Sequence, residues 1–285
     1  MMRNGNHLVT HSSPRSISTK IVSSSNESEF NFNAYMLEKR HAINQALDAA
    51  VPLKEPLKLV GGTESTVMPV ACAIEMILAV WVVCDCLPCM DNHDLCRGKP
   101  STHKSFGEAM TILATYSLSA LAFEYITKAT KLGVTSANIV RVLSETARLL
   151  MEEVADGQAA DIFEAQVKSG IGIEQLEYIY LRKIAQAFEG SVVAGAIVGG
   201  ASQEEINRLR KYGRYTGLLF QIKDDIIDYE KDLFVDKITY SKLIGKEKSM
   251  EVIEKLIRKA EDELEGFDPE KAAPLKALLC DIDNW

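Results

Sequence analysis

The stretch Phe220–Tyr229, FQIKDDIIDY, places three carboxylates inside a segment that otherwise has the composition of a helix. Asp224 and Asp228 are four residues apart and therefore share one helical face, with Asp225 beside them. An acidic face in water is one interpretation. The apolar neighbours, however, predict a mostly buried helix, where an unpaired charge is costly. Carboxylates gathered in this way are typical of a site where Mg²⁺ joins them to phosphate.

A second acidic stretch lies far upstream, at Cys84–Pro100, CDCLPCMDNHDLCRGKP. It follows the apolar run Ala71–Val83 and contains Asp85 and Asp91, with Arg97 and Lys99 just after them. A metal–diphosphate site needs carboxylates for the metal and basic groups for the remaining phosphate oxygens. The two stretches together therefore predict such a site.

Taken together, LPCMDNHDLCRGKPSTHKSFGE and GLLFQIKDDIID resemble the trans-isoprenyl diphosphate synthases of the plant geranylgeranyl diphosphate synthase type. The resemblance extends from about Phe32 to Asp281. It implies an all-α bundle with two Asp-rich helix walls facing a central cavity. It also implies Mg²⁺-assisted ionisation of an allylic diphosphate, followed by attack by isopentenyl diphosphate.

The resemblance also implies roles for single residues. The implied metal ligands come from both acidic stretches and are Asp85, Asp91, Asp224, Asp225 and Asp228. Lys183 and Gln221 are the implied catalytic residues, and the implied substrate-binding residues are Arg97, Lys183, Gln221 and Lys237. Each basic residue taken alone fits an exposed surface side chain better. The order of these residues relative to the two motifs reverses that judgement and favours the functional interpretation.

Val80 and Trp81 precede the first acidic stretch, where the resemblance implies the floor of the elongation pocket. An indole at this position predicts a short product, because close-packed interiors do not yield easily to extra volume. The alternative is that Trp81 belongs to the core and is turned away from the cavity.

The chain departs from the family pattern at several positions. Cys86 stands in place of an Asp, and a thiol is a poor ligand for Mg²⁺. Cys96 stands in place of an Arg, which removes a bidentate phosphate clamp. Leu78 replaces a His, and Ile184 replaces a Thr. Near residues 59–60 the chain also lacks a helical hairpin whose loop carries basic residues for isopentenyl diphosphate, and the loop after the second acidic stretch is shortened.

These features support two hypotheses. The first is a geranylgeranyl or geranyl diphosphate synthase-type prenyltransferase that is impaired on its own. The second is a non-catalytic or regulatory small subunit that partners a full-length synthase, although the paired Cys-x-x-x-Cys motifs of known small subunits are absent. A decayed gene copy or splice product is a third possibility.

Composition limits the remaining choices. A net charge of −8 argues against nucleic acid as a partner. The longest apolar run, Met68–Cys84, contains Glu75, and we expect no membrane-spanning segment. Six cysteines are present, and four of them cluster between residues 84 and 96. A zinc site is conceivable there, but the spacing is not a familiar one, and free thiols are the favoured interpretation.

The domain organisation is expected to be simple. Residues 1–29 read as a transit peptide or a disordered tail, because residues 1–26 are basic, rich in serine and free of acidic residues. A plastid location follows, with the cytoplasm as the alternative. Residues 30–285 form one isoprenyl diphosphate synthase domain. The apolar helix expected at Glu108–Phe123 predicts a dimer, either a homodimer or a heteromer with a full-length synthase.

Hydrophobic periodicity and end signals locate the helices. A capping box at Ser202 and Glu205 starts one helix, and Asp268–Pro269 starts the last. No alternating strand pattern stands out. The expected helices are Phe32–Val51, Met68–Cys84, Glu108–Lys128, Asn138–Val154, Glu174–Gly199, Glu204–Tyr229 and Glu247–Leu264.

Overall fold

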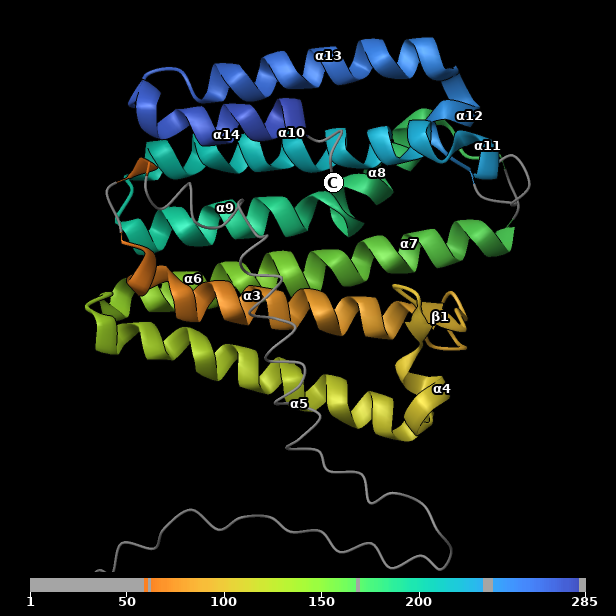
Figure 1. Ribbon diagram of the computed structural model, residues 1–285, viewed down its shortest axis with the longest axis horizontal. Coiled ribbons are helices and arrows are strands. Elements are labelled where there is room, and N and C mark those ends of the chain that lie inside the picture. The colour runs from red at the N-terminus through yellow and green to blue at the C-terminus, as the bar shows by residue number, and fades with distance from the viewer. Residues whose placement is uncertain (1–58, 61–62, 168–169, 233–237, 282–285) are drawn as a thin grey trace, which may run out of the picture.

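The computed structural model describes residues 59–60, 63–167, 170–232 and 238–281. The long helices run side by side across the molecule as a bundle (Figure 1). The structure therefore confirms the all-α class. The elements are α3 (Glu64–Asp85), β1 (Leu95–Cys96), β2 (Lys99–Pro100), α4 (Thr102–Phe106), α5 (Glu108–Thr127), the 3₁₀ helix η1 (Lys128–Leu132), α6 (Ser136–Ala147), the π-helix η2 (Arg148–Glu153), α7 (Val154–Val167), α8 (Ile173–Lys183), α9 (Ala185–Gly199), α10 (Gln203–Ile227), α11 (Tyr229–Asp232), α12 (Tyr240–Ile244), α13 (Lys246–Glu263) and α14 (Pro269–Asp281).

Two expected helices are divided in the structure. The segment Glu174–Gly199 is not one helix, because the chain breaks at Ile184 between α8 and α9. The segment Asn138–Val154 becomes α6 and then the π-helix η2, and the helical path continues through α7. Hydrophobic periodicity alone predicted neither the break at Ile184 nor the π-helix η2, because the apolar pattern continues through both.

The expected absence of strands is also corrected. β1 and β2 pair as an antiparallel hairpin, with Leu95 opposite Pro100 and Cys96 opposite Lys99. The turn residues Arg97 and Gly98 both have positive φ, at 51° and 75°, as a tight two-residue hairpin turn requires. Strands of two residues are too short to give a readable alternation.

The signals that predicted the starts of two helices are both present in the structure. Ser202 and Glu205 form the complete capping box at the start of α10. The Asp268 carboxylate accepts hydrogen bonds from the backbone N–H groups of Glu270 and Lys271 at the start of α14. Both devices satisfy N–H groups that a helix leaves without partners in its first turn.

The core lies where α3 and α9 pass through the middle of the bundle (Figure 1). α9 is buried along nearly its whole length, and α10 packs directly along it. Glycines permit this close approach. A Cβ at Gly213 would lie 2.8 Å from the Cα of Glu189, and one at Gly217 would lie 2.5 Å from the Cα of Ala185. α10 is thereby held at a fixed position against α9.

Two helices are longer and more apolar than we expected from the sequence. Ser65–Asp85 and Glu108–Leu132 have the length and composition of membrane spans, with mean hydropathies of 2.3 and 1.3. The expectation that no apolar run reaches that length was therefore wrong. Core helices of globular proteins pass the same test, and α3 packs between α5 and α9 inside the bundle.

Three predictions lie outside the described residues. These are the segment 1–29, the helix expected at Phe32–Val51 and the substrate role of Lys237.

Candidate functional site

Both acidic stretches lie at the same end of the bundle, where α3 and α10 finish near α8 and the β-hairpin (Figure 1). Asp85 is the last residue of α3, and Asp91 lies in the loop that follows. The loop folds back on the helix, since the Asp91 N–H donates to the Asp85 carbonyl at 2.9 Å. The chain thus keeps the two predicted carboxylates of the first stretch together.

Lys183 lies opposite these carboxylates, at the end of α8. Its Nζ donates to Asp161 Oδ2 at 2.8 Å. Burial acts to lower the pKa of Lys183, but the charges of Asp161, Asp85 and Asp91 outweigh burial, and the net pKa is raised. Lys183 is therefore held as a cation among three carboxylates.

For Asp85, burial is not outweighed by the neighbouring charges. Its pKa is raised, first by burial and then by the charges of Asp91 and Asp161, although Lys183 opposes the shift. Three carboxylates near one lysine leave this region short of positive charge. A group that carries negative charge at such a site is stabilised when a further cation arrives.

Sequence reasoning missed Asp161. It lies on α7, and α7 and α8 approach closely where a Cβ on Gly157 would lie 2.7 Å from the backbone N of Lys183. The only sequence signal is a glycine four residues before an aspartate on one helix. That spacing indicated nothing until α8 was placed beside α7.

The carboxylates of the second stretch occupy different environments. Asp224 is exposed, Asp228 is partly buried at the C-cap of α10, and Asp225 is only 1% exposed. Asp225 accepts hydrogen bonds from Tyr180 Oη at 2.7 Å, from the Tyr240 backbone N–H at 2.9 Å and from Gln221 Nε2 at 3.1 Å. Asp225 therefore ties α10 to α8 and to the start of α12, and Gln221 donates to Asp225 from one turn earlier on α10.

The fit of Mg²⁺ depends on the donors at this end of the bundle. Across the described part of the chain, no three His, Cys, Asp or Glu side chains lie close enough together to hold a metal ion. Mg²⁺ is commonly bound by one or two carboxylates, with phosphate oxygens and waters completing its coordination. Asp85 with Asp91 on one side, and Asp224 with Asp228 on the other, supply donors of that type.

Cys86 and Cys96, two of the departures from the family pattern, differ in exposure. Cys86 directly follows Asp85 and is 5% exposed, whereas Cys96 is partly exposed at the end of β1. Burial, together with the neighbouring Cys96, raises the pKa of Cys86 to about 11. No disulfide joins any of the six cysteines in the structure.

Arg97 occupies the exposed turn of the β-hairpin. Its charge lowers the pKa of Glu75, although burial has the larger effect and keeps that pKa above its ordinary value. Arg97 therefore acts electrostatically on α3 from outside the bundle.

The predicted pocket-floor residues lie one turn before Asp85. Val80 is 6% exposed, and Trp81 is partly buried against the core. Trp81 Nε1 donates to the Leu150 carbonyl at 2.6 Å, which links α3 to the π-helix η2. The indole is thus oriented by a hydrogen bond as well as by packing.

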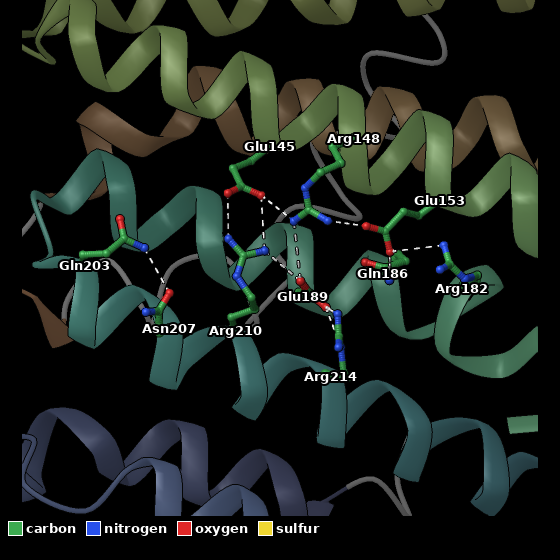
Figure 2. Close-up of polar contacts among 10 residues, drawn as sticks. All are labelled: Glu145, Arg148, Glu153, Arg182, Gln186, Glu189, Gln203, Asn207, Arg210 and Arg214. Atoms are coloured by element: carbon green, nitrogen blue, oxygen red, sulfur yellow. Dashed lines mark hydrogen bonds and ion pairs between the residues drawn. The ribbon is translucent and has the colours of Figure 1, made fainter. Parts of the chain in front are cut away.

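A second group of charges crosses the bundle from α6 and η2 to α9 and α10 (Figure 2). Glu189 is fully buried and accepts from Arg210 Nη1 at 2.8 Å and from Arg214 Nε at 2.9 Å. Glu145 accepts from Arg210 at 2.7 Å and from Arg148 at 2.9 Å. We call Glu145, Arg148, Glu189, Arg210 and Arg214 the ion-pair network. In it, every carboxylate contacts at least two guanidinium groups.

Comparisons with known proteins identify a family that the chain resembles over most of its length. Residues 43–266 match the family model described as polyprenyl synthetase. A chloroplastic geranylfarnesyl diphosphate synthase from Leucosceptrum canum is 50% identical over 290 residues, covering 88% of this chain and 79% of that protein. A chloroplastic geranylgeranyl pyrophosphate synthase from Catharanthus roseus is 47% identical, covering 89% and 81%. The large subunit 1 of a chloroplastic heterodimeric geranylgeranyl pyrophosphate synthase from Arabidopsis thaliana is 46% identical, covering 89% and 79%.

Solved structures share the fold. An FPP/GFPP synthase from Zymomonas mobilis superposes with a TM-score of 0.75 at 30% identity, covering 81% of each chain. A geranylgeranyl pyrophosphate synthetase from the archaeon Geoglobus acetivorans gives a TM-score of 0.74 at 23% identity, covering 86% of this chain and 89% of that one. The second likeness concerns the fold alone.

Proposed function

Because the chain belongs to the polyprenyl synthetase family, we propose that it is a trans-prenyltransferase chain that condenses an allylic diphosphate with isopentenyl diphosphate. The observation that carries the proposal is Lys183, a cation held among Asp161, Asp85 and Asp91 at the end of the bundle where α10 brings its own carboxylates. This arrangement suits a ligand that carries both negative oxygens and bound metal ions.

The residues have distinct roles in this reaction. Mg²⁺, when bound, neutralises the diphosphate and so helps it to leave. Asp85 and Asp91 on one side, and Asp224 and Asp228 on the other, hold the metal–diphosphate complex, while Lys183 donates to its oxygens. The C–O bond of the allylic diphosphate breaks, and the electron pair stays on the leaving group. Isopentenyl diphosphate then attacks the allylic carbon and afterwards loses a proton.

Three further residues belong to the proposed substrate site. Gln221 orients Asp225 by hydrogen bonding and completes the α10 side of the site. Lys237, which lies outside the described residues, is assigned to the allylic diphosphate. Arg97 is assigned to isopentenyl diphosphate, and its place in an exposed turn leaves its guanidinium within reach of solvent ligands.

We further propose that the chain turns over slowly by itself. Cys86 and Cys96 place two thiols where a carboxylate and a guanidinium are expected. Losing one preorganised charge typically reduces a rate by about 10²–10³-fold. The proposed absence of a hairpin near residues 59–60 accords with the lengths of the alignments. The three relatives align over 290, 292 and 294 positions while using only 88%, 89% and 89% of this chain of 285 residues, so they contain segments that this chain lacks.

A regulatory subunit is the second candidate function. It is favoured by α5, whose outer face exposes Leu113 at 58% and Tyr116 at 72%. An apolar face of this kind suits a second subunit of the same family. One relative is named as the large subunit of a heterodimeric enzyme. Several relatives are named as chloroplastic, which supports a plastid location for this chain and a transit peptide within residues 1–29.

The test is a prenyl-transfer assay of the purified chain, alone and mixed with a full-length relative. We expect turnover of the chain alone to fall well below the usual ~1–10³ s⁻¹. Cys86→Asp combined with Cys96→Arg should improve ionisation without restoring elongation, and adding the missing hairpin should restore both. Turnover within the usual range for the unmodified chain would refute impairment. A strictly monomeric mass at micromolar concentration would refute the dimer.

Binding is tested separately by calorimetric titration of an allylic diphosphate with and without Mg²⁺. We expect heat that depends on Mg²⁺ and that is weakened by Asp224→Ala. Equal heats for the two chains would count against the assigned site, whatever the outcome of the rate assay.

A further inference from the structure

Lys183 is the last residue of α8, at the point where the helical path breaks before α9. The break residue Ile184 has φ −109° and ψ −51°, and its apolar side chain gives no capping hydrogen bond to the start of α9. A helix begins with N–H groups that lack partners inside the helix, and a polar N-cap side chain commonly satisfies one of them. Because this break has no such cap, contacts with neighbouring elements are needed to hold it in place.

One carboxylate contacts the chain on both sides of this break (Figure 2). Glu153 is the last residue of η2, and its Oε2 accepts a hydrogen bond from Gln186 Nε2 on α9 at 2.7 Å. The same oxygen lies 3.8 Å from Arg182 Nη1 on α8. Arg182 directly precedes Lys183, and Gln186 follows it by three positions. Glu153 therefore joins the end of α8 to the first turn of α9 around Lys183.

The π-helix η2 helps to place Glu153 at the break. In an α-helix, side chains three or four positions apart share a face, whereas a π-helix hydrogen-bonds residues five positions apart. Arg148 and Glu153 are five positions apart in η2, and Arg148 Nη1 donates to Glu153 Oε1 as an ion pair. Glu153 is thus held through one oxygen while the other faces Arg182 and Gln186. Since Arg148 belongs to the ion-pair network, the network is connected through Glu153 to the segment that carries Lys183.

The two contacts of Glu153 Oε2 differ in strength. Gln186 is 1% exposed, and a buried amide donor is costly to leave without its partner. The Arg182 contact is longer, and the Arg182 side chain is 34% exposed, so solvent screens this ion pair. Arg182 is also held independently by Asp156 Oδ2, at 3.3 Å. Loss of the Glu153 carboxylate should therefore loosen the α9 side of the break more than the α8 side.

We propose that Glu153 is a positioning residue that fixes the location of Lys183 through Arg182 and Gln186. The inference rests on the proposed function in one respect, the role of Lys183 as a donor to the oxygens of a diphosphate. Asp161 contacts the ammonium group of Lys183, whereas Glu153 holds the backbone from which that side chain extends. Hydrogen bonds to oxygen need a donor within a narrow range of distance. Movement of this backbone therefore weakens the contact between Lys183 and a diphosphate.

The first measurement needs no ligand. Hydrogen exchange of the native full chain, followed by mass spectrometry, reports on the backbone N–H groups of residues 181–188. We expect faster exchange there in Glu153→Ala and in Gln186→Leu, which remove the contact from opposite sides, and a smaller increase in Glu153→Gln, which keeps an acceptor oxygen. Glu152→Ala is the matched control, because Glu152 is exposed on the same π-helix, and it should leave the exchange unchanged. Natural exchange rates at residues 181–188 in Glu153→Ala would overturn the inference, and unchanged exchange in α13 checks that each variant keeps its fold.

The second measurement is calorimetric titration with inorganic diphosphate and Mg²⁺. We expect Glu153→Gln to weaken binding by about 2–30-fold, the range for a residue that acts on a site without contacting the ligand. In a Lys183→Met background the same substitution should have no further effect, because Glu153 acts through Lys183. An equal loss in both backgrounds would refute the positioning role and indicate a general structural one. If the natural chain bound no diphosphate, the proposed function would fail, and the exchange at residues 181–188 would by itself decide whether Glu153 holds the break.

Discussion

The carboxylates of the ion-pair network and those at the acidic end of the bundle lie in opposite electrostatic surroundings. In the network, hydrogen bonds from Arg210 and Arg148 outweigh burial and lower the pKa of Glu145. At the acidic end, Asp85, Asp91 and Asp161 share Lys183, and the pKa of Asp85 is raised. The network is neutralised within the chain, whereas the acidic end lacks positive charge and is suited to receive it from outside.

The largest expected effect comes from breaking the network at its centre. Glu189→Gln removes the carboxylate that Arg210 and Arg214 both contact in a fully buried position. Removing one partner of a buried ion pair costs about 3–5 kcal/mol, because the remaining charges lose their compensation. We expect that loss in urea unfolding at pH 7.

The matched control for Glu189→Gln is Asp91→Asn at the acidic end, where the side chain is exposed. This change should alter the free energy of unfolding by about 0.5 kcal/mol or less. Equal losses for the two variants would show that the two regions do not differ in the way proposed.

The next effect concerns Asp225, which lies at the acidic end but has the hydrogen-bond partners of a structural residue. Asp225→Asn keeps the shape but turns one acceptor oxygen into a donor. That donor faces either Tyr180 Oη and the Tyr240 N–H, at the position of Oδ2, or Gln221 Nε2, at the position of Oδ1. We expect a loss of about 2–3 kcal/mol in the free energy of unfolding, and about 1 kcal/mol for Tyr180→Phe. If Asp225→Asn keeps full stability and loses only Mg²⁺-dependent diphosphate binding, Asp225 is a ligand in the manner of Asp224.

The sequence predicted the features that depend on residues close together along the chain. The capping box at Ser202, the Asp268–Pro269 start and the pairing of Asp85 with Asp91 all arise within a few residues. Family resemblance added the importance of Lys183. It gave no indication that Asp225 is buried and satisfied by protein donors, because the three aspartates of DDIID look equivalent in one dimension.

Contacts between segments that are far apart in the sequence could not be predicted. Arg210 and Glu145 are 65 positions apart, and Lys183 and Asp161 are 22 apart on different helices. Nothing in either segment specifies the partner until α10 packs against α9 at Gly213 and Gly217, and α7 packs against α8 at Gly157.

A smaller pair of effects should have opposite signs. The pKa of Glu145 lies below 4.5, so its ionised form stabilises the folded chain above that pH, and the contribution is lost as pH falls through the lowered pKa. Glu145→Gln should therefore reduce the free energy of unfolding at pH 7 by about 1 kcal/mol, a value reduced by solvent screening, and by less in acid.

Asp85→Asn should act in the other direction. The pKa of Asp85 is raised above 3.8, so the folded chain loses stability as pH rises from that value through the raised pKa. The variant avoids this loss and should be more stable than the natural chain at pH 7, with no advantage below pH 3.8. Unfolding is measured in chelator. If Glu145→Gln and Asp85→Asn both lowered the free energy of unfolding at pH 7, the acidic end would not lack positive charge as argued.

The smallest effect tests the hydrogen bond that joins the two regions. Trp81 lies one turn before Asp85, and its Nε1 donates to the carbonyl of Leu150 in η2, the helix that also carries Arg148. Trp81→Phe keeps an aromatic ring and removes the donor, so we expect a loss of about 1 kcal/mol in the free energy of unfolding. If η2 transmits strain between the regions, Trp81→Phe and Glu189→Gln should be non-additive by about 0.5 kcal/mol or more. Strict additivity would show that the regions are independent. Product length tests the proposed pocket-floor role of Trp81 separately. If the ring and not the N–H limits the pocket, Trp81→Ser should lengthen the product while Trp81→Phe does not.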